Sequence, residues 1–198
     1  MQPNQRKMTT SAQRSNARDP REPIVFSAGI CHITGRSLSM AMRAGTAIMG
    51  HMGAELNLLE ETEENLAELA RAITLYKRLR SLIHGGDQYR LDTPDFLNAH
   101  GVVAPAKHHA LFSVAWLTGH KTTLPPVLVL DGLAPERDYR LRLVWPVPWR
   151  AVTSPGVVEA LDLTGNGHVA RGEALMTVGM QLPLALPQTV LLFELEPA

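Results

Sequence analysis

The chain has 198 residues, of which 45% are hydrophobic and 19% are charged, a composition that supports a packed core. Nineteen Lys and Arg residues balance nineteen Asp and Glu residues. Because no overall field attracts nucleic acid or an anionic membrane, we expect neither as a partner. No apolar run reaches the roughly 20 residues of a membrane-spanning helix. The single cysteine, Cys31, excludes an internal disulfide, and no secretory signal is evident, so we expect a cytoplasmic protein.

Residues 1–23 form a basic arm with almost no apolar periodicity. It holds five basic and two acidic residues: Arg6, Lys7, Arg14, Arg18 and Arg21, with Asp19 and Glu22. A polar segment of this kind buries too little apolar surface to offset the entropy of ordering. We therefore predict a disordered arm over residues 1–23, a helical region over residues 24–86 and an all-β domain over residues 87–198.

Two helices are predicted after the arm. The first begins near Ser37, a plausible N-cap, and ends near Gly50 or Gly53. The second begins at Thr62, has acidic residues in its first turn and basic residues near its end, and stops at Gly85 in a left-handed conformation. Its predicted buried stripe has helical spacing and comprises Leu66, Leu69, Ala70, Ile73, Tyr76, Leu79 or Arg80, and Ile83.

Short strand-like runs separated by Pro and Gly turns dominate the remainder of the chain. The clearest runs are residues 111–117, 127–130, 139–144 and 189–195. Several short strands at this spacing are typical of an antiparallel sandwich. The sequence thus predicts an α+β protein in which two helices precede an antiparallel β-sandwich.

An ordered series of motifs resembles the bacterial α-galactosidases of glycoside hydrolase family 36. The series runs from H-x-T-G-R (within 31–36) through G-H-x-G (50–53), L-Y-K-R-L-R-x-L-I-H-G-G-D (75–87) and G-V-V-A (101–104) to M-T-V-G-M-Q-L-P (176–183). The likeness covers roughly residues 30–198. It implies that the predicted helices are the terminal helices of a truncated (β/α)8 barrel, and that the strands form the β-sandwich beside it.

The same resemblance implies a function in carbohydrate catabolism. Members of the family hydrolyse terminal α-D-galactosides, such as melibiose and raffinose, with retention and without a metal or organic cofactor. Their catalytic aspartates lie in K-W-D and G-G-G-R-x-D motifs, and neither motif occurs in this sequence. A complete (β/α)8 barrel also needs roughly 250 residues. We therefore expect a hydrolase fragment that has no catalytic residue of its own and meets an α-galactoside oligosaccharide only through the complete enzyme.

Two alternatives remain open at this point. The chain could be a stand-alone, non-catalytic module that binds carbohydrate or another protein, so its status as an enzyme is undecided. Helices that lack barrel partners would also expose apolar side chains, which makes a homo-oligomer formed through these helices a second expectation.

The resemblance places three candidate substrate-binding residues near the barrel mouth. His32, Thr34 and Arg36 follow the end of the family's last barrel strand, and active sites of this fold lie at the carboxyl ends of strands. The competing interpretation is structural: Arg36 pairs with a carboxylate of the barrel, while His32 and Thr34 bind loop backbone.

Two further patterns favour structural roles. Residues 162–173 have the length of a calcium loop, but Thr164 replaces the usual third-position ligand, so a turn between strands is favoured. No histidine or cysteine pair has metal-ligand spacing, and we predict no metal site. Trp145 and Trp149 could stack on a sugar ring, although an interface or core role is favoured.

Overall fold

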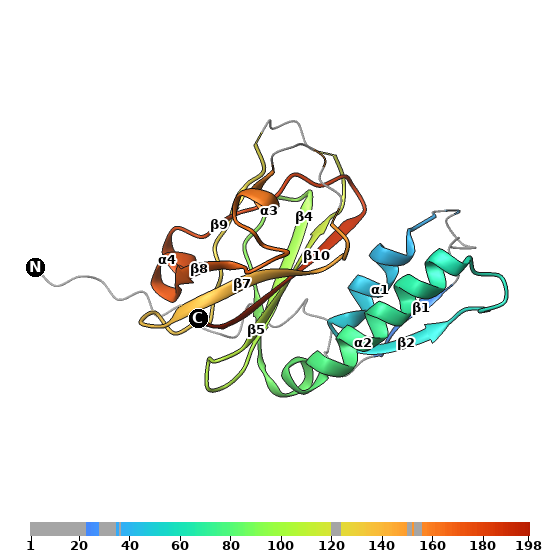
Figure 1. The fold of residues 1–198 in the computed structure, drawn as a ribbon, viewed down its shortest axis with the longest axis horizontal. Helices are drawn as coiled ribbons and strands as arrows, with labels where there is room; N and C mark the ends of the chain where they lie inside the picture. The colour runs from blue at the N-terminus through green and yellow to red at the C-terminus, as the bar shows by residue number, and fades with distance from the viewer. Residues whose placement is uncertain (1–22, 28–34, 36, 120–123, 150–151, 153–155) are drawn as a thin grey trace, which may run out of the picture.

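The computed structural model describes residues 23–27, 35, 37–119, 124–149, 152 and 156–198 (Figure 1). It is an α+β structure whose main sheet is antiparallel. The first elements in the chain are β1 (Pro23–Ser27), α1 (Met40–Ile48), β2 (His51–Glu55) and α2 (Glu63–Gly85). Of the basic arm predicted over residues 1–23, residues 1–22 lie outside the described residues, so their predicted disorder stays a prediction, whereas Pro23 already belongs to β1. No helix in the described ranges is long and apolar enough to cross a membrane.

The first four elements form a β-α-β-α unit. β1 and β2 pair in parallel, with Pro23 opposite His51 and Ser27 opposite Glu55. A parallel pair needs a crossover connection, and this crossover contains α1. Helix α1 is shorter than predicted, because Ser39 rather than Ser37 caps it, with its Oγ accepting from the Met42 amide at 3.2 Å.

Strand β2 was missed in the sequence. The apolar spacing through Met52 predicted that the first helix continues to Gly50 or Gly53, whereas the chain leaves the helix at Met49 and starts a strand at His51. A five-residue strand without alternating polarity gives no signal that separates it from the end of a helix.

Helix α2 begins as predicted. The Oγ1 of Thr62 accepts from the Asn65 amide at 3.2 Å, and Glu63 and Glu64 occupy the first turn. The predicted C-terminal stop is wrong in detail, because Gly86 ends the helix in an extended conformation and donates its amide to the Leu82 carbonyl at 2.8 Å.

The buried stripe of α2 is partly as predicted. Leu69, Leu79 and Ile83 are buried, together with Ala72 and Leu82. Ala70 and Ile73 were predicted to be buried and are exposed, Ile73 by 36%. The helix is rotated toward α1 and the main sheet, and this rotation leaves the flank that carries Ala70 and Ile73 uncovered.

The rest of the chain forms two antiparallel sheets. Their elements are β3 (Asp87–Arg90), β4 (Leu97–Val103), β5 (Ala110–Trp116), β6 (Val127–Leu128), β7 (Asp138–Trp145), α3 (Val157–Ala160), β8 (His168–Arg171), α4 (Gly172–Thr177), β9 (Met180–Gln181) and β10 (Thr189–Pro197). The six-stranded sheet has the order β3-β4-β5-β10-β7-β8, and β6 pairs with β9. The strand predictions at β5, β6, β7 and β10 are confirmed within a few residues, whereas β3, β4, β8 and β9 were not predicted.

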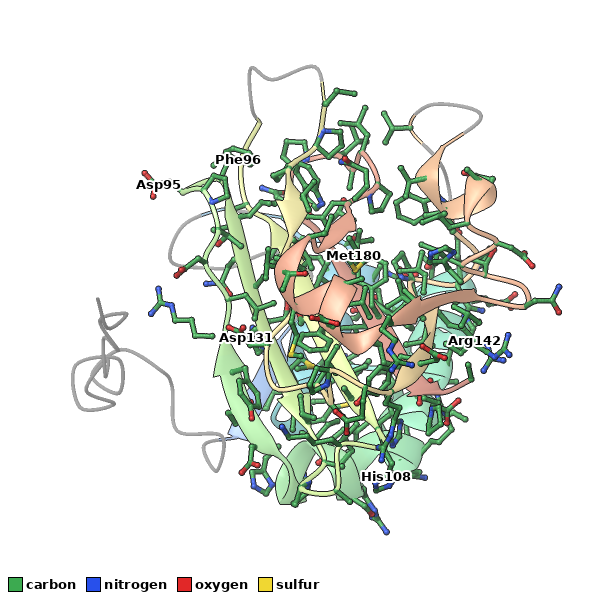
Figure 2. The ribbon with its side chains drawn as sticks, turned by 90° about the vertical axis from the view of Figure 1, so that its left-hand side faces the viewer. Asp95, Phe96, His108, Asp131, Arg142 and Met180 are labelled. Atoms are coloured by element: carbon green, nitrogen blue, oxygen red, sulfur yellow. The ribbon has the colours of Figure 1, made fainter. Side chains whose placement is uncertain are left out.

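The six-stranded sheet is covered on both faces. On β10, Leu191, Phe193 and Leu195 point into a core that includes residues of β6, β9, α3 and α4. The alternate residues Val190 and Leu192 point into a second core that includes α1 and α2. Figure 2 shows Met180 in front of the sheet, with Phe96 and His108 toward opposite ends of its long strands. The β-α-β-α unit is therefore packed against the sheet.

Candidate functional site

A hollow lined mainly by polar side chains lies in the β-α-β-α unit. It is formed by the start of α1, the loop after β2 and the first turns of α2. The lining residues are Ser37, Leu38, Ser39, Met40, Arg43, Asn57, Glu60, Glu61, Glu64, Asn65 and Glu68. The loop follows the carboxyl end of β2, and ligands of parallel β/α folds bind at this end of the strands. This hollow is the candidate substrate-facing site.

A buried ion pair organises the hollow. The side chains of Arg43 and Glu61 are only 7% and 11% exposed, and Nη2 lies 3.5 Å from Oε1. The second carboxylate oxygen of Glu61 accepts from Asn65 Nδ2 at 2.6 Å. These contacts tie α1 to the start of α2. Because Glu61 is already paired with a cation and an amide, it suits positioning better than proton transfer.

The predicted sugar-contacting residues His32, Thr34 and Arg36 lie outside the described residues. Their neighbours Gly35 and Ser37 are exposed, and Ser37 lines the hollow. A role in substrate binding for the three residues therefore stays a prediction.

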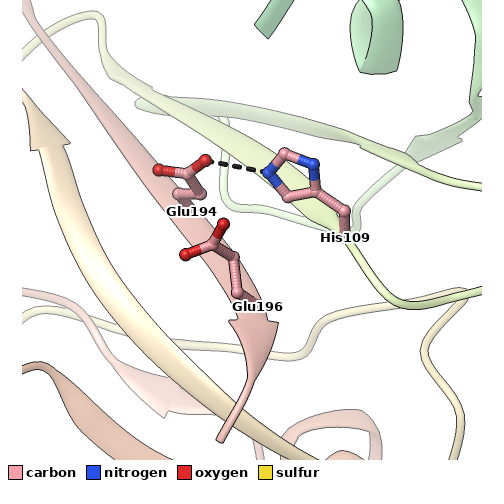
Figure 3. Close-up of side chains that lie close together, drawn as sticks. All are labelled: His109, Glu194 and Glu196. Atoms are coloured by element: carbon pink, nitrogen blue, oxygen red, sulfur yellow. Dashed lines mark hydrogen bonds and ion pairs between the residues drawn. The ribbon is translucent and has the colours of Figure 1, made fainter. Parts of the chain in front are cut away.

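A second charged cluster joins the β-α-β-α unit to the sheet through Arg78 of α2. Figure 3 shows three other members of the cluster, His109, Glu194 and Glu196. The Glu194 side chain on β10 is 5% exposed and receives two hydrogen bonds from the Arg78 guanidinium, at 2.6 and 2.8 Å. His109 Nε2 lies 2.8 Å from the same carboxylate. A two-pronged contact between guanidinium and carboxylate fixes orientation as well as distance, so the cluster locks α2 onto β10 and the start of β5.

The partners of Glu194 determine its protonation state. Burial acts to raise the pKa of Glu194, but the hydrogen bonds from His109 and Arg78 outweigh burial and lower this pKa to about 2. The pKa of Arg78 is raised, chiefly by its hydrogen bond to Glu194. The cluster is therefore an ionised pair at neutral pH.

The same cluster has ligand types that suit a metal ion, because atoms of His109, Glu194 and Glu196 lie within 4.8 Å of one another. Both carboxylates already face cations: Arg78 binds Glu194, and Arg142 lies 3.4 Å from Glu196. This arrangement fits an ion-pair network rather than a cation site.

The sequence alone did not predict the cluster, because residues 109 and 194 are far apart in the chain. A glutamate inside the apolar run 189–195 is the signal that could have indicated it.

Of the two patterns for which structural roles were favoured, the first is a turn, although it connects a helix to a strand rather than two strands, and residues 168–173 belong to β8 and the start of α4. Asp162 Oδ2 accepts from the Asn166 amide at 2.8 Å and from its Nδ2 at 3.0 Å, within the turn over residues 162–167 that connects α3 to β8. Trp145 is buried, and its Nε1 donates to the Ala41 carbonyl at 2.9 Å. Trp149 is partly buried against the other core. Trp145 thus forms part of the contact between the sheet and α1.

Comparison with known proteins gives two family matches in chain order. Residues 24–86 match the Melibiase family, and residues 97–191 match the glycosyl hydrolase family 36 C-terminal domain. An α-galactosidase of Escherichia coli is 38% identical over 171 residues, which are 85% of this chain and 24% of that enzyme. A bifunctional α-galactosidase/sucrose kinase of Mediterraneibacter gnavus is 34% identical over 54% of this chain and 12% of that protein. The chain thus spans about a quarter, or less, of these relatives.

Solved structures of α-galactosidases are also similar to this chain. The galactosidase domain of an α-galactosidase-sucrose kinase superposes with a TM-score of 0.71 and 27% identity, covering 88% of this chain and 22% of that one. The α-galactosidase AgaB of Geobacillus stearothermophilus gives a TM-score of 0.72 and 25% identity, covering 89% and 22%. The related AgaA of the same organism has been crystallised with raffinose, and its 24% identity to this chain supports the fold.

Proposed function

Because the chain belongs to the glycoside hydrolase family 36 α-galactosidases, with a Melibiase match over residues 24–86 and a family 36 C-terminal match over residues 97–191, we propose that it is the carboxyl-terminal part of an enzyme that hydrolyses terminal α-D-galactosides. The observation that carries this proposal is the order of its elements: a parallel β-α-β-α unit leads directly into an antiparallel sheet and shares a core with it. In this role the chain contributes the last units of a (β/α)8 barrel and the β-sandwich beside it.

The domain division follows from the same proposal. Residues 24–86, with Pro23 at the start of β1, carry the barrel units and residues 87–198 the all-β domain, while the polar sequence before Pro23 is a separate arm. His32, Thr34 and Arg36 lie near the barrel mouth and contact the sugar or support the loop that does. Arg43 and Glu61 hold α1 and α2 in place beside this mouth, since their ion pair links α1 to the loop before α2 and Glu61 also binds Asn65 in the helix.

The catalytic carboxylates of this activity are not assigned to the chain. Retaining hydrolysis needs two carboxyl groups about 5–5.5 Å apart on either side of the glycosidic bond. In the hollow, Glu61 is held by Arg43 and Asn65, and Glu60 accepts from Asn57 Nδ2 at 2.8 Å. Loss of a catalytic carboxylate commonly lowers the rate by several powers of ten, so the chain alone should be inactive. The substrate, an α-galactoside, is bound by the complete enzyme, which we place in the cytoplasm.

The test measures activity with and without the missing part. The chain is assayed on p-nitrophenyl α-galactopyranoside alone, and again after co-expression with the part of the E. coli relative that it does not match. We expect no turnover by the chain alone and turnover by the pair. Turnover by the chain alone that disappears on substituting one of its own carboxylates would overturn the assignment.

The alternative function is a stand-alone carbohydrate-binding module. Titration calorimetry of the chain with galactose and raffinose separates the two ideas. Saturable binding by the chain alone, together with no activity in the co-expressed pair, would favour the module.

A further inference from the structure

We infer that two copies of this chain pair through one stripe of α2, with the two helices antiparallel and a two-fold axis at Ile73. The members of the stripe follow one another at spacings of three or four residues, so they share one side of the helix. They are Glu63, Leu66, Ala70, Ile73, Lys77 and Arg80. The inference goes beyond the proposed function, because it concerns the chain by itself and involves no catalytic group.

The stripe is open to solvent along most of its length. Leu66 is half-buried and the other five members are exposed, Ile73 by 36%. Ala70 and Ile73 place an apolar patch at the middle of the stripe, and an apolar helix stripe packs against another element in a stable fold. Within the described part of the chain, no ion pair uses Glu63, Lys77 or Arg80. The apolar middle and the charged ends are therefore both available to a partner.

The order of charges along α2 selects the partner. Residues 63–68 contain three glutamates and no basic residue, whereas residues 77–84 contain three Lys or Arg residues, His84 and no acidic residue. Antiparallel pairing sets the acidic half of each helix against the basic half of the other, and it also opposes the two helix dipoles. Parallel pairing would set like charges side by side. Helix α2 is therefore complementary in charge to a reversed copy of itself.

The spacing of the stripe also fits a reversed copy. Reversal about Ile73 opposes this residue to its own copy and opposes Ala70 to Lys77 of the second copy. It likewise opposes Leu66 to Arg80 of the second copy. The apolar residues then cover the alkyl stems of the two long cations, whose charged ends stay at the rim beside the acidic first turn. Because the same patch is used on both copies, each contact occurs twice and the assembly closes at two.

Sedimentation equilibrium of the full-length chain over a concentration series tests the pairing. We expect a monomer–dimer equilibrium with no larger species. Ile73→Glu sets two carboxylates against each other at the axis and should raise the dissociation constant at least about tenfold. The matched control is Thr74→Glu, which adds the same charge to an exposed neighbour about 100° further around the helix. This control should dimerise like the wild type.

A charge exchange tests the antiparallel order. One double variant, Lys77→Glu with Arg80→Glu, makes the basic end acidic, and a second, Glu63→Lys with Glu64→Lys, makes the acidic end basic. Each variant alone should dimerise at least about tenfold more weakly, because both ends of its pair then carry like charges. An equal mixture should form a heterodimer, since both ends are complementary again. Association in the mixture also shows that each variant is folded.

Four results would overturn the inference. They are a chain that stays monomeric at every concentration, a dimer that Ile73→Glu leaves intact, equal effects of Ile73→Glu and Thr74→Glu, and a mixture that associates no better than either double variant alone. None of these measurements involves an α-galactoside. Failure of the pairing would therefore leave the proposed function standing, and failure of the co-expression assay would leave the pairing standing.

Discussion

The two faces of the six-stranded sheet differ in what covers them. One face carries Phe112, Tyr139 and Phe193 and is closed by segments that follow β5 in the chain. The other face carries Val190, Leu192 and Trp145 and is closed by helices that precede the sheet. The first core is almost wholly apolar, whereas the second is bordered by the Arg78–Glu194 ion pair. The comparison indicates that the sheet and its first core form the stable body, to which the second core attaches the β-α-β-α unit.

Adjacent residues on β10 offer the most direct way to break this comparison. Phe193 and Leu192 are both fully buried but face opposite cores. Phe193→Ala should lower the free energy of unfolding by about 3–5 kcal/mol, and Leu192→Ala by about 2–4 kcal/mol. Chemical denaturation measures the free energy of unfolding of each variant, and hydrogen exchange shows which strands and helices lose protection.

The pattern of hydrogen exchange decides between one cooperative unit and two regions of different stability. Leu192→Ala should speed exchange in α1 and α2 more than in β5, whereas Phe193→Ala should speed exchange everywhere. If Leu192→Ala accelerates the amides of β5 as much as those of α2, the two faces belong to one cooperative unit and the comparison is wrong.

Gly45 tests how closely α1 approaches the sheet. A Cβ at this position would lie 2.4 Å from both Trp145 Nε1 and Val190 Cγ1. Gly45→Ala should therefore destabilise the protein by about 1–3 kcal/mol, although alanine favours a helix by about 1 kcal/mol. Thermal unfolding measures the change.

Gly85 in α2 is the matched control, because a Cβ there meets nothing within 4 Å. Gly85→Ala should be neutral or stabilise by up to about 1 kcal/mol. Equal destabilisation by both substitutions would show that the close approach of α1 is unimportant.

The ion pair should contribute less than the cores. Glu194→Gln removes the charge that Arg78 and His109 contact, and should cost about 1–2 kcal/mol. This is below the range for a fully buried pair, because Arg78 is 49% exposed. Glu196→Gln, whose pair with Arg142 is exposed, should change stability by less than about 0.5 kcal/mol. Urea titration of both variants measures the difference.

The smallest expected effect is the pH dependence of the stability difference between the wild type and Glu194→Gln. Because the folded pKa of Glu194 is about 2 and its ordinary value is 4.5, the stabilisation is fully present above about pH 4.5. It should decrease as the pH falls toward 2, where the carboxyl becomes protonated in both states. Wild type and Glu194→Gln should therefore converge in urea midpoint near pH 2, and a constant gap from pH 7 to 2 would contradict the lowered pKa.

The sequence predicted the elements with strong local signals. The cap at Thr62, the acidic first turn and the long apolar period defined the start of α2, and β-branched or aromatic runs indicated β5, β7 and β10. Strand β2 is short and has no alternating polarity, and the edge strand β3 is short and polar, so the pairing of both depends on other segments of the chain. The exposure of Ile73 likewise depends on how α2 is rotated against the sheet, which its period alone does not determine.

The candidate site was less predictable. The ordered motifs indicated the family, and the loop around residues 31–36 was identified only through that resemblance. The pairing of Arg43 with Glu61, and of His109 with Glu194, joins residues separated by 18 and 85 positions. Such contacts are set by tertiary packing, and no local spacing reports them.

The junction at Gly86 limits where the gene for this protein could be divided by recombination. Helix α2 ends at Gly85 and β3 begins at Asp87, so one residue separates them. A Cβ at Gly86 would lie 2.5 Å from Val102 Cγ2 and 2.8 Å from the Leu82 and Val103 carbonyl oxygens. No slack exists here for an inserted linker. Recombination at this boundary would separate the sheet from α1 and α2 and expose Val102, Leu111 and Leu192 to solvent. We therefore expect the β-α-β-α unit and the sheet to be inherited together, unless another helix layer replaces α1 and α2.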